Sequence, residues 1–599
     1  MRLEFSDWLI IALYFVVSAA IGLAYTRRSS QSLADYFVSG RSLPWWLAGT
    51  SMVATTFAAD TPLVVAGLVA KYGVAGNWLW WNGAFSGVLT VFFFSRLWRR
   101  AGVLTDVEFA ELRYGGRPAA VLRGFRAIYL AIPINLIIMG WVTRAMVTIL
   151  EISLNIDSWK AAIFLFGVTA LYSVMGGLWG VIVTDLFQFI FAMGGSILLA
   201  VLAVQSMGGL DALAVQAAAH FGSTEAAFGI IPPLDAPWLP LTTLLVWLSV
   251  QWWAAWYPGQ EPGGGGYVVQ RILSAKDERH GLLATLWFTI AHYALRPWPW
   301  ILVGFVALIR YPGLDNPEEG YVRVMVDVLP SPYKGLLLAA FAAAYMSTIS
   351  THLNWGASYL VNDVYVRFIK PDASPRAQVL ASRGATLVLM VSSLVVMGFL
   401  SSVEQGWKIL LALGAGTGLV FILRWYWWRV NAWSEISAMA ASFVTSLALA
   451  TGGHSMSDTG TRDYAFTMLT TVLVTTVVWL TVTFLTAPES DATLERFYRR
   501  VRPGGPGWRG VARRLGYGDE PIPGGALSWV NWLAGLVAVY AAVFAVGAVV
   551  TGAPLRGLVY AVAATGAFLL IYRNLRADEQ LMASVDTSRD PGLGLGSGT

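Results

Sequence analysis

The 599-residue sequence contains no cysteine and few charges. Without cysteine, disulfides, iron–sulfur clusters and thiolate-bound metals are excluded, and five histidines argue against a dedicated imidazole metal site. Charged residues make up 13% of the chain, against about 25% in an average soluble domain. A chain with so few charged residues cannot supply the polar surfaces of several soluble domains. Disorder, a coiled coil and a nucleic-acid-binding domain are excluded on the same grounds, because the net charge of +5 arises from basic loops rather than from a basic face.

Apolar residues make up 56% of the chain, and the mean hydropathy is +0.60. Crossing about 30 Å of hydrocarbon needs roughly 20 helical residues. Fifteen stretches meet this requirement, at 7–26, 45–70, 77–97, 121–151, 159–177, 181–206, 239–257, 281–309, 334–364, 379–401, 406–428, 433–451, 464–486, 528–550 and 556–572. Short alternating strands are absent, and lipid requires each backbone group to be satisfied within its own segment. The sequence therefore predicts an all-α polytopic membrane protein.

Lysine and arginine predict the orientation of the chain, because cytoplasmic loops are enriched in them. Every second loop is basic, through Arg27, Arg28, Arg96, Arg99, Arg100, Arg271, Lys276, Arg279, Arg367, Lys370, Arg376, Arg424, Arg429 and the seven arginines of 487–527. We therefore expect an outer N-terminus and a cytoplasmic C-terminus, in the plasma (inner) membrane of a bacterium. Residues 487–527 are expected to be a basic cytoplasmic loop, 528–575 to hold additional spans, and 576–599 to be a cytoplasmic tail.

Ionisable groups inside the predicted spans are costly and by default mark a pathway or a site. Asp60, Asp185, Arg144 and Arg296 are such groups, and the alternative is that they pair with one another or lie at an interface. The span around Asp60 is a poor lipid helix, because it also contains Gly49, Thr50, Ser51, Thr55, Thr56, Thr61 and Pro62. Proline interrupts a helix, and broken helices expose carbonyls that coordinate sodium in transporters.

The ninth predicted span carries two hydroxyl pairs, Ser347–Thr348 and Ser350–Thr351. Positions three apart share a helix face, so these four hydroxyls can form one stripe of oxygen ligands for a hard cation. The same pattern also fits hydroxyls that merely support helix packing, and the spacing alone does not decide between the two.

Five motifs occur in order along the chain: YFVSGRSLPWW (36–46), LTDVEFAELRYG (104–115), YSVMGGLWGVIVTDLFQ (172–188), VVQRILSAK (268–276) and the hydroxyl stripe. Through them, residues 1 to about 485 resemble the sodium:solute symporter family. The resemblance implies a symporter membrane domain over 1–486. Its LeuT-type core, about 45–430, would hold two inverted five-helix repeats, with one extra helix before it and about four after it.

The resemblance also implies sodium ligands. For a first sodium these are the carbonyls of Ala54, Phe57 and Ala344 and the hydroxyls of Ser347 and Thr348. Some members bind a second sodium through an acid in a TDxxQ motif and the next hydroxyl pair. Those positions are Asp185, Ser350 and Thr351 here. Both one and two bound sodium ions are therefore compatible with the sequence.

For the solute, family positions point to Thr56, Asp60, Thr61, Trp80, Trp81 and Asn82. The chain departs from sugar-carrying relatives where they place an amide, since Gly265 and Gly266 stand there, and Gln251, Gln260 and Glu261 are the nearest replacements. His292 or Tyr293 falls where those relatives place a lysine. A sugar or polyol is the expected solute. A carboxylate or an amino acid is the alternative solute, because the guanidinium group of Arg144 can bind a carboxylate through two parallel hydrogen bonds.

The predicted function is sodium-driven import of a small polar solute, with the solute and the bilayer as partners and no nucleic acid. A non-transporting solute sensor is the alternative from another class, although no signalling domain follows the spans. An enzyme is not expected, because no nucleophile or acid–base constellation is present.

Overall fold

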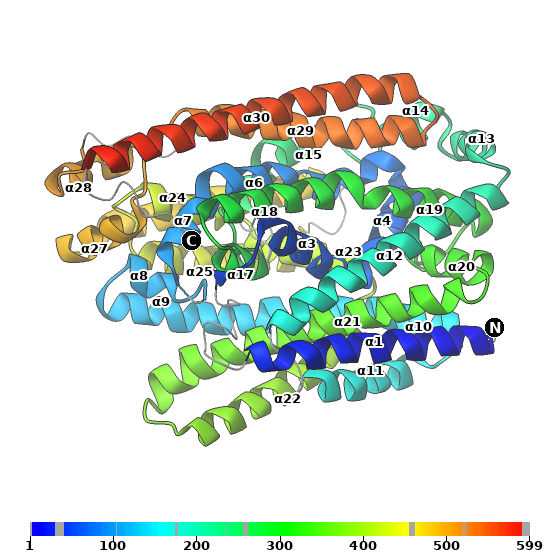
Figure 1. The fold of residues 1–599 in the computed structure, drawn as a ribbon, viewed down its shortest axis with the longest axis horizontal. Helices are drawn as coiled ribbons and strands as arrows, with labels where there is room; N and C mark the ends of the chain where they lie inside the picture. Colours follow the sequence, from blue (N-terminus) through cyan, green and yellow to red (C-terminus); the bar gives the residue numbers. More distant parts are fainter. Residues whose placement is uncertain are drawn as a thin grey trace, which may run out of the picture.

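The computed structural model describes residues 3–29, 41–103, 105–173, 178–234, 236–255, 262–454, 462–518, 522 and 524–589. These residues form helices that run side by side along one long axis (Figure 1). The only extended pairing among them is an isolated bridge between Leu43 and Ala275. The predicted all-α fold class is confirmed.

The first predicted repeat follows the peripheral helix α1 (Phe5–Ser29). Its elements are α3 (Trp45–Thr55), α4 (Asp60–Tyr72), η2 (Val74–Asn77), α5 (Trp78–Trp81), α6 (Gly83–Leu89), η3 (Thr90–Phe94), α7 (Ser95–Ala101), α8 (Phe109–Arg113), α9 (Gly116–Tyr129), η4 (Leu130–Ile134), α10 (Asn135–Leu154), α11 (Ser158–Ser173) and α12 (Leu178–Ser206). Two connecting helices follow, α13 (Leu210–Phe221) and α14 (Thr224–Phe228).

The second predicted repeat begins with short helices before and after residues 256–261, which lie outside the described part. Its elements are α15 (Leu241–Val246), η5 (Trp247–Gln251), α16 (Trp252–Ala254), α17 (Gly266–Ser274), α18 (Glu278–Ile290), η6 (Ala291–Leu295), α19 (Pro297–Arg310), α20 (Glu319–Val328), α21 (Tyr333–Ser358), η7 (Tyr359–Ile369), α22 (Pro375–Phe399), α23 (Val403–Gly414) and α24 (Gly418–Tyr426).

Further helices follow the second repeat: α25 (Ala432–Thr451), α26 (Arg462–Leu485), α27 (Asp491–Val501), η8 (Pro506–Trp508), α28 (Arg509–Arg514), α29 (Leu527–Val550) and α30 (Pro554–Arg589). The predicted cytoplasmic loop 487–527 thus contains two short helices. Leu494 and Phe497 of α27 are buried in one apolar cluster with Trp508. Helix α30 continues to Arg589, well past the predicted end of its span at 572.

Local sequence signals explain several helix starts. The Ser402 side chain accepts a hydrogen bond from the amide of Gln405 at the start of α23, and Ser374 caps α22 ahead of Pro375. Asn431 and Ser434 form a reciprocal capping box on α25. Such caps satisfy amide groups that have no partner within the helix.

Eight helices within the described ranges are long and apolar enough to cross a membrane, or ten if each of two bent pairs counts as one span. The bent pairs are α3/α4, with a 62° bend, and α23/α24, with a 50° bend. The prediction of a broken second span is therefore confirmed. The number of fifteen spans stays a prediction, because several other segments divide into shorter helices.

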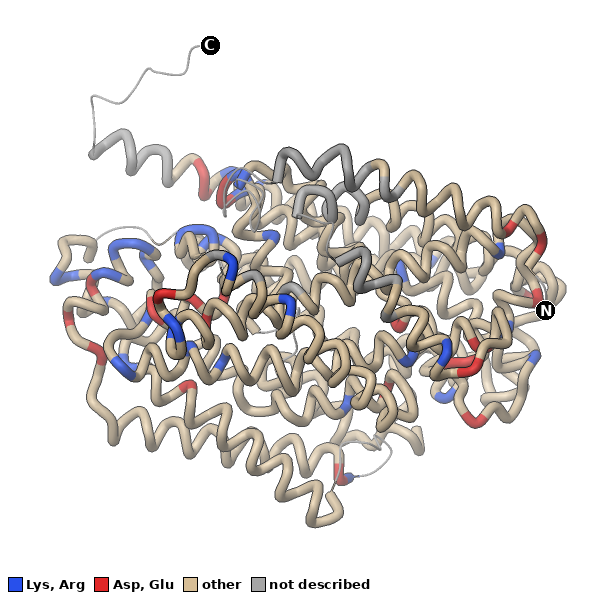
Figure 2. Tube along the Cα trace, turned by 90° about the horizontal axis from the view of Figure 1, so that it is seen from below, with Lys and Arg blue, Asp and Glu red and all other residues tan. Residues whose placement is uncertain are grey.

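Basic residues from separate predicted inner loops gather at one end of the bundle (Figure 2). Arg99 donates to the carbonyl oxygens of Ala275 and Lys276, and Arg100 pairs with Glu278. Arg96 pairs with Asp578 of α30. The predicted inner loops therefore lie together, as the expected orientation requires, while the side of the membrane that they occupy stays a prediction.

Candidate functional site

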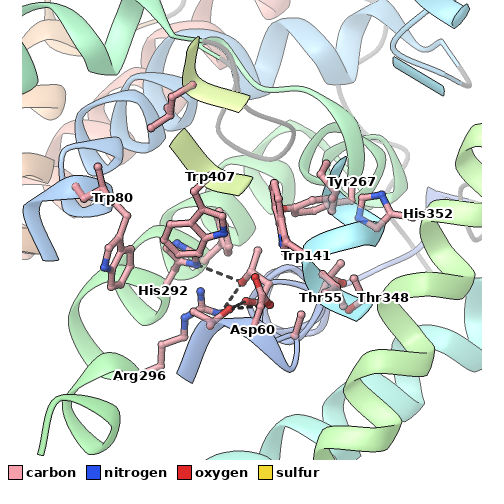
Figure 3. Close-up of a pocket in the computed structure, with 18 residues that line it drawn as sticks. Thr55, Asp60, Trp80, Trp141, Tyr267, His292, Arg296, Thr348, His352 and Trp407 are labelled. Atoms are coloured by element: carbon pink, nitrogen blue, oxygen red, sulfur yellow. Dashed lines mark hydrogen bonds between the residues drawn. The ribbon is translucent and has the colours of Figure 1, made fainter. Parts of the chain in front are cut away.

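A pocket of about 90 Å³ lies where α3 gives way to α4. Its walls come from both repeats. Polar and charged groups that line it are Thr55, Thr56, Asp60, Thr61, Thr348, His292, Arg296 and His352, and its aromatic groups are Trp80, Trp141, Tyr267, Phe288 and Trp407. In Figure 3, Arg296, His292 and Asp60 point toward one another.

The break between α3 and α4 supplies backbone oxygens to this pocket. The amide of Phe57 donates to the carbonyl oxygen of Ala54 at 2.9 Å, in place of a regular helical bond. The Thr61 hydroxyl donates to the carbonyl oxygen of Thr56 at 3.1 Å, across the break. A helix that ends in the middle of a bundle leaves carbonyl groups available to a ligand.

Arg296 is the cation of the pocket, and its side chain is buried. Its Nη1 donates to the carbonyl oxygen of Val53 at 3.2 Å and to the Thr56 hydroxyl at 2.8 Å. Asp60, also buried, interacts electrostatically with Arg296 and accepts a hydrogen bond from the Trp141 side chain. An acid and a base of opposite formal charge therefore lie in the same pocket, beside the break.

His292 extends the polar network, because its Nδ1 lies 3.2 Å from the Thr56 hydroxyl. It belongs to η6, a π-helical turn, and Arg296 directly follows that turn. Trp80 contacts His292 edge-on, with ring centroids 5.5 Å apart, and stacks on Tyr293 at 5.6 Å. The π-helical turn thus places a histidine at the pocket and a supporting tyrosine beside the Trp80 ring.

Helix α29 packs behind the segment that carries Trp80, Trp81 and Phe85. The Tyr540 hydroxyl donates to the carbonyl oxygen of Trp81 at 2.9 Å, and Trp532 Nε1 donates to that of Phe85 at 3.2 Å. Around Asn82 the helix is interrupted, and the amide of Phe85 bonds back only three residues, to Asn82. Helix α29 therefore supplies hydrogen bonds where the segment around Asn82 departs from regular helix.

The structure brings five of the predicted solute residues to the pocket: Thr56, Asp60, Thr61, Trp80 and His292. Trp81 and Gln251 do not line it, and neither do Asn82, Tyr293 and Arg144. Asn82 is buried and donates to the carbonyl oxygens of Trp78 and Leu79, and Tyr293 supports Trp80. Arg144 lies on α10, where it interacts electrostatically with Glu151.

The remaining solute candidates, Gln260 and Glu261, lie outside the described residues. Gly263, Gly264 and Gly266 follow them with φ of 89°, 83° and 54°. Glycine adopts such angles without strain. These glycines lead directly into α17, whose second residue, Tyr267, lines the pocket.

The predicted sodium residues lie on α3, at the break and on α21. Thr348 lines the pocket, Ala344 and Ser347 are buried nearby on α21, and Ala54 and Phe57 flank the break. For the second ion, the Ser350 hydroxyl donates to the carbonyl oxygen of Ser347 at 3.1 Å. Thr351 is half-buried, and Asp185 belongs to α12 with its side chain outside the described part.

Sodium fits the chemistry of this donor set. Among the described residues, no group of three or more His, Asp or Glu side chains could hold a metal. A cation at Ala54, Ser347 and Thr348 would instead meet carbonyl and hydroxyl oxygens, which are the ligands that hard cations prefer.

Several pocket residues were not among the predicted site residues. Arg296 was identified from the sequence only as a charge within a span, and its rotation toward Asp60 follows from the π-helical turn before it. His352 is held by Asn135, whose Oδ1 lies 2.7 Å from its Nδ1. Trp141, Tyr267 and Trp407 carried no sequence signal, because an apolar span with tryptophan is equally compatible with packing.

A second polar cluster lies at the start of α23, the helix that also carries Trp407. The Glu318 carboxylate accepts hydrogen bonds from the amides of Val403 and Glu404, both at 3.0 Å. Lys71 of α4 pairs with Glu404 at 2.6 Å, and Lys408 pairs with it at 2.7 Å. The cluster links α4, the second half of the broken span, to α23 and to the segment before α20.

A pocket at a broken helix, built from two helical repeats, defines a membrane transporter of the LeuT-type fold. Residues 36–444 match the sequence model of the sodium:solute symporter family. The match covers more than half of the chain, which therefore belongs to this family and is a transporter rather than an enzyme.

Relatives and one solved structure agree with this assignment. The chain is 26% identical to a sodium/glucose cotransporter of Vibrio parahaemolyticus over 472 residues, which cover 75% of this chain and 85% of that protein. It is also 26% identical to sodium/myo-inositol cotransporter 2 of Rattus norvegicus, over 74% of this chain and 70% of that protein. A Na+-coupled sialic acid symporter shares its fold, with a TM-score of 0.65 at 20% identity over 82% of this chain and 99% of that one.

Proposed function

We propose that this symporter imports a neutral, hydroxyl-rich solute, a sugar or polyol, by alternating access driven by sodium. The observation that carries the proposal is the charge balance of the pocket. The pocket holds one acid and one base, Asp60 and Arg296, which interact electrostatically, so a solute without net charge adds no further charge to a desolvated site, where an unpaired charge is costly.

The rest of the pocket suits such a solute. Trp80, Trp141 and Trp407 offer flat apolar faces, and Thr56, Thr61 and His292 offer hydrogen-bonding groups. Solute sites of this kind are mostly apolar, with a few placed polar groups that fix orientation. Sodium/glucose and sodium/myo-inositol cotransporters are among the relatives and support the same solute class.

Sodium bound by Ala54, Phe57, Ala344, Ser347 and Thr348 would join the break to α21. The same break carries Thr56 and Asp60 into the solute pocket. An ion that orders the break therefore raises the affinity for solute, and by reciprocal linkage the solute raises the affinity for sodium.

Uptake into proteoliposomes tests the proposal. The purified chain is supplied with radiolabelled glucose, myo-inositol, a neutral amino acid or a dicarboxylate, with an inward sodium gradient or with potassium in its place. We expect sodium-dependent uptake of a sugar or polyol. Sodium-dependent uptake of the dicarboxylate alone would favour a second candidate function, carboxylate transport. In that case Arg296 would bind a carboxylate of the solute instead of interacting with Asp60.

A further inference from the structure

His352 lines the solute pocket from α21, one helical turn after Thr348 (Figure 3). Its Nδ1 faces α10, where it lies 2.7 Å from Oδ1 of Asn135. Asn135 is the first residue of α10 and directly follows the π-helical turn η4. The proposed sodium and solute contacts leave both side chains without a role. The hydrogen bonds of Asn135 decide what His352 offers to the pocket.

The backbone of α21 fixes the orientation of the Asn135 side-chain amide. One end of this amide lies 2.9 Å from the carbonyl oxygen of His352. A carbonyl oxygen only accepts hydrogen bonds, so this end is the NH2 group, and the end that faces Nδ1 of His352 is the oxygen. The amide oxygen also only accepts. Nδ1 of His352 is therefore the donor of the second bond and carries a hydrogen.

Gly356 leaves the room that this arrangement needs. It lies one turn after His352 on α21, and a Cβ atom at this position would stand 2.5 Å from Nδ2 of Asn135. That separation is shorter than Cβ atoms tolerate, so a larger residue would displace the amide from the His352 carbonyl oxygen. Glycine at 356 and asparagine at 135 together hold the imidazole ring in place.

The imidazole of His352 is neutral. The side chain is buried, and the partners that the structure gives its ring are the Asn135 amide and the Trp355 ring, whose centroid lies 5.8 Å away. Neither partner carries a charge, and a buried charge without a counter-charge is costly. A neutral imidazole carries one hydrogen, and Nδ1 holds it.

Nε2 of His352 is therefore an acceptor, because the bond made by one ring nitrogen sets the state of the other. Among the described residues, no side chain or backbone group bonds this Nε2. Nor is it one of their enclosed polar atoms without a partner, unlike Nε2 of His292. With Nδ1 directed toward α10, the lone pair of Nε2 is open to the pocket that the ring lines.

We propose that Nε2 of His352 accepts a hydrogen bond from a hydroxyl group of the solute, and that Asn135 is the positioning residue that fixes this polarity. The inference deepens the proposed transport of a sugar or polyol and rests on it. A carboxylate oxygen at the same place would meet a second acceptor with no hydrogen between them. His352 thus selects for a solute hydroxyl and against a carboxylate, since a site built to bond a hydroxyl rejects analogues that cannot supply it.

Nitrogen NMR tests the position of the hydrogen without transport. The full chain is labelled with 15N-histidine and reconstituted in lipid vesicles. It contains five histidines, and the signals of His352 are those that disappear in His352→Phe. We expect a protonated Nδ1 and an unprotonated Nε2. A hydrogen on Nε2 in the parent protein would overturn the proposal.

Two variants of Asn135 separate positioning from a purely structural role. Asn135→Asp and Asn135→Leu both remove the bond to the carbonyl oxygen of His352, so a structural role predicts the same spectrum for both. Asn135→Asp keeps an acceptor for the hydrogen on Nδ1 and should keep it there, whereas Asn135→Leu should allow it to move to Nε2. Identical His352 signals in the two variants would contradict the positioning role.

Uptake of monodeoxy analogues tests the hydrogen bond itself. In the parent protein, the analogue that lacks the bonded hydroxyl should have a KM about tenfold higher than the complete solute. His352→Phe should raise the KM of the complete solute by a similar factor and add nothing for that analogue, because the two changes remove the same bond. Equal effects of His352→Phe on the complete solute and on every analogue would overturn the bond.

The matched control is His220→Phe, at an exposed position of α13, which should leave every KM unchanged. The two measurements also separate this inference from the proposed function. Absence of sugar and polyol uptake by the parent protein would refute the proposed function, and with it the hydroxyl partner, whatever the NMR signals show. Uptake of a sugar or polyol by a protein with its hydrogen on Nε2 would refute the role of His352 alone.

Discussion

At the scale of single residues, Arg296 and Asp60 define the chemistry of the pocket. Sequence alone identified both as costly charges within spans but left open whether they meet. The structure brings them together at the break, because η6 turns the following residue toward α3. Periodicity could not predict that turn, because apolar residues surround this span on all sides and leave no polar stripe whose phase could shift.

Neutralising one member of this pair should harm the protein more than neutralising both. Arg296→Gln leaves Asp60 buried without the cation that interacts with it, which should lower thermal stability. Arg296→Gln with Asp60→Asn removes both charges and should recover a large part of the lost thermal stability. A double-mutant cycle measures the coupling, and additive losses would show that the two side chains do not interact.

The first sodium site makes a second prediction at this scale. Ser347→Ala or Thr348→Ala removes a hydroxyl oxygen from the proposed ligand set, and the sodium concentration for half-maximal uptake should rise about tenfold, as expected for a lost bond to a charged group. The control is Ser358→Ala, also on α21, whose hydroxyl donates to the carbonyl oxygen of Trp355. Normal sodium activation in both site variants would refute the assignment.

At the scale of elements, π-helical turns occur in the second and third predicted spans of both repeats, although at different places along those spans. Turns η3 and η6 interrupt the second span of each repeat, and η4 and η7 interrupt the third. The sequence predicted these spans as continuous helices, because apolar residues fill them throughout. It did predict that the span 45–70 is broken, since polar residues and Pro62 do not suit a plain lipid helix, and the structure places the break at 56–59.

Helix α29 should influence solute binding although it does not line the pocket. Tyr540→Phe keeps the ring that stacks on Trp78, with centroids 5.3 Å apart, and removes the hydroxyl that bonds Trp81. Losing that bond should cost about 1–3 kcal/mol and raise the KM for the solute several-fold, without changing sodium activation at saturating solute.

The matched control for Tyr540→Phe is Tyr560→Phe on the neighbouring α30. Tyr560 is 37% exposed and packs on Phe544, so removing its hydroxyl should alter neither KM nor maximal uptake. If Tyr540→Phe lowers thermal stability but leaves KM at its original value, α29 supports the fold without positioning the pocket.

The cluster at the start of α23 predicts a pH dependence of stability. Burial, opposed by the amides of Val403 and Glu404, raises the pKa of Glu318 to about 7. The folded protein therefore binds this proton more tightly than the unfolded chain, whose pKa is about 4.3. The stability from this group is fully present at low pH and is lost as the pH rises through about 7.

Thermal unfolding between pH 4 and pH 8 measures this effect. Glu318→Gln should reduce the loss of unfolding free energy between these pH values by an amount on the order of 1–3 kcal/mol. Glu319→Gln is the control, because Glu319 is partly exposed and pairs with Arg323 at 2.8 Å. An identical pH profile in the parent protein and Glu318→Gln would contradict the role of this carboxyl.

At the scale of the whole molecule, the stoichiometry of transport tests the second sodium site. Asp185→Asn removes the proposed charged ligand, so the sodium Hill coefficient and the charge moved per solute should both fall if two ions are carried. Current and solute flux measured together in one preparation give this ratio. An unchanged ratio with normal uptake would mean that Asp185 binds no transported ion.

The general architecture followed from composition, because few charges and long apolar stretches permit only a helical membrane bundle. The composition did not predict how the individual helices pack against one another. Nothing in 528–575 indicated that α29 would contact Trp81, since a uniformly apolar helix carries no information about which neighbour it packs against. Likewise, the basic loop 487–527 gave no sign that Phe497 and Trp508 would be buried together.

The hydrogen bonds from α29 have a consequence for biosynthesis. Tyr540 and Trp532 bond carbonyls that lie 459 and 447 residues earlier in the chain. The ribosome has therefore made nearly the entire protein before the pocket wall receives its last partners. Until then the nascent chain carries these carbonyls without their final partners in the membrane, so a chain halted before Tyr540 would lack the hydrogen bond that this residue gives to Trp81.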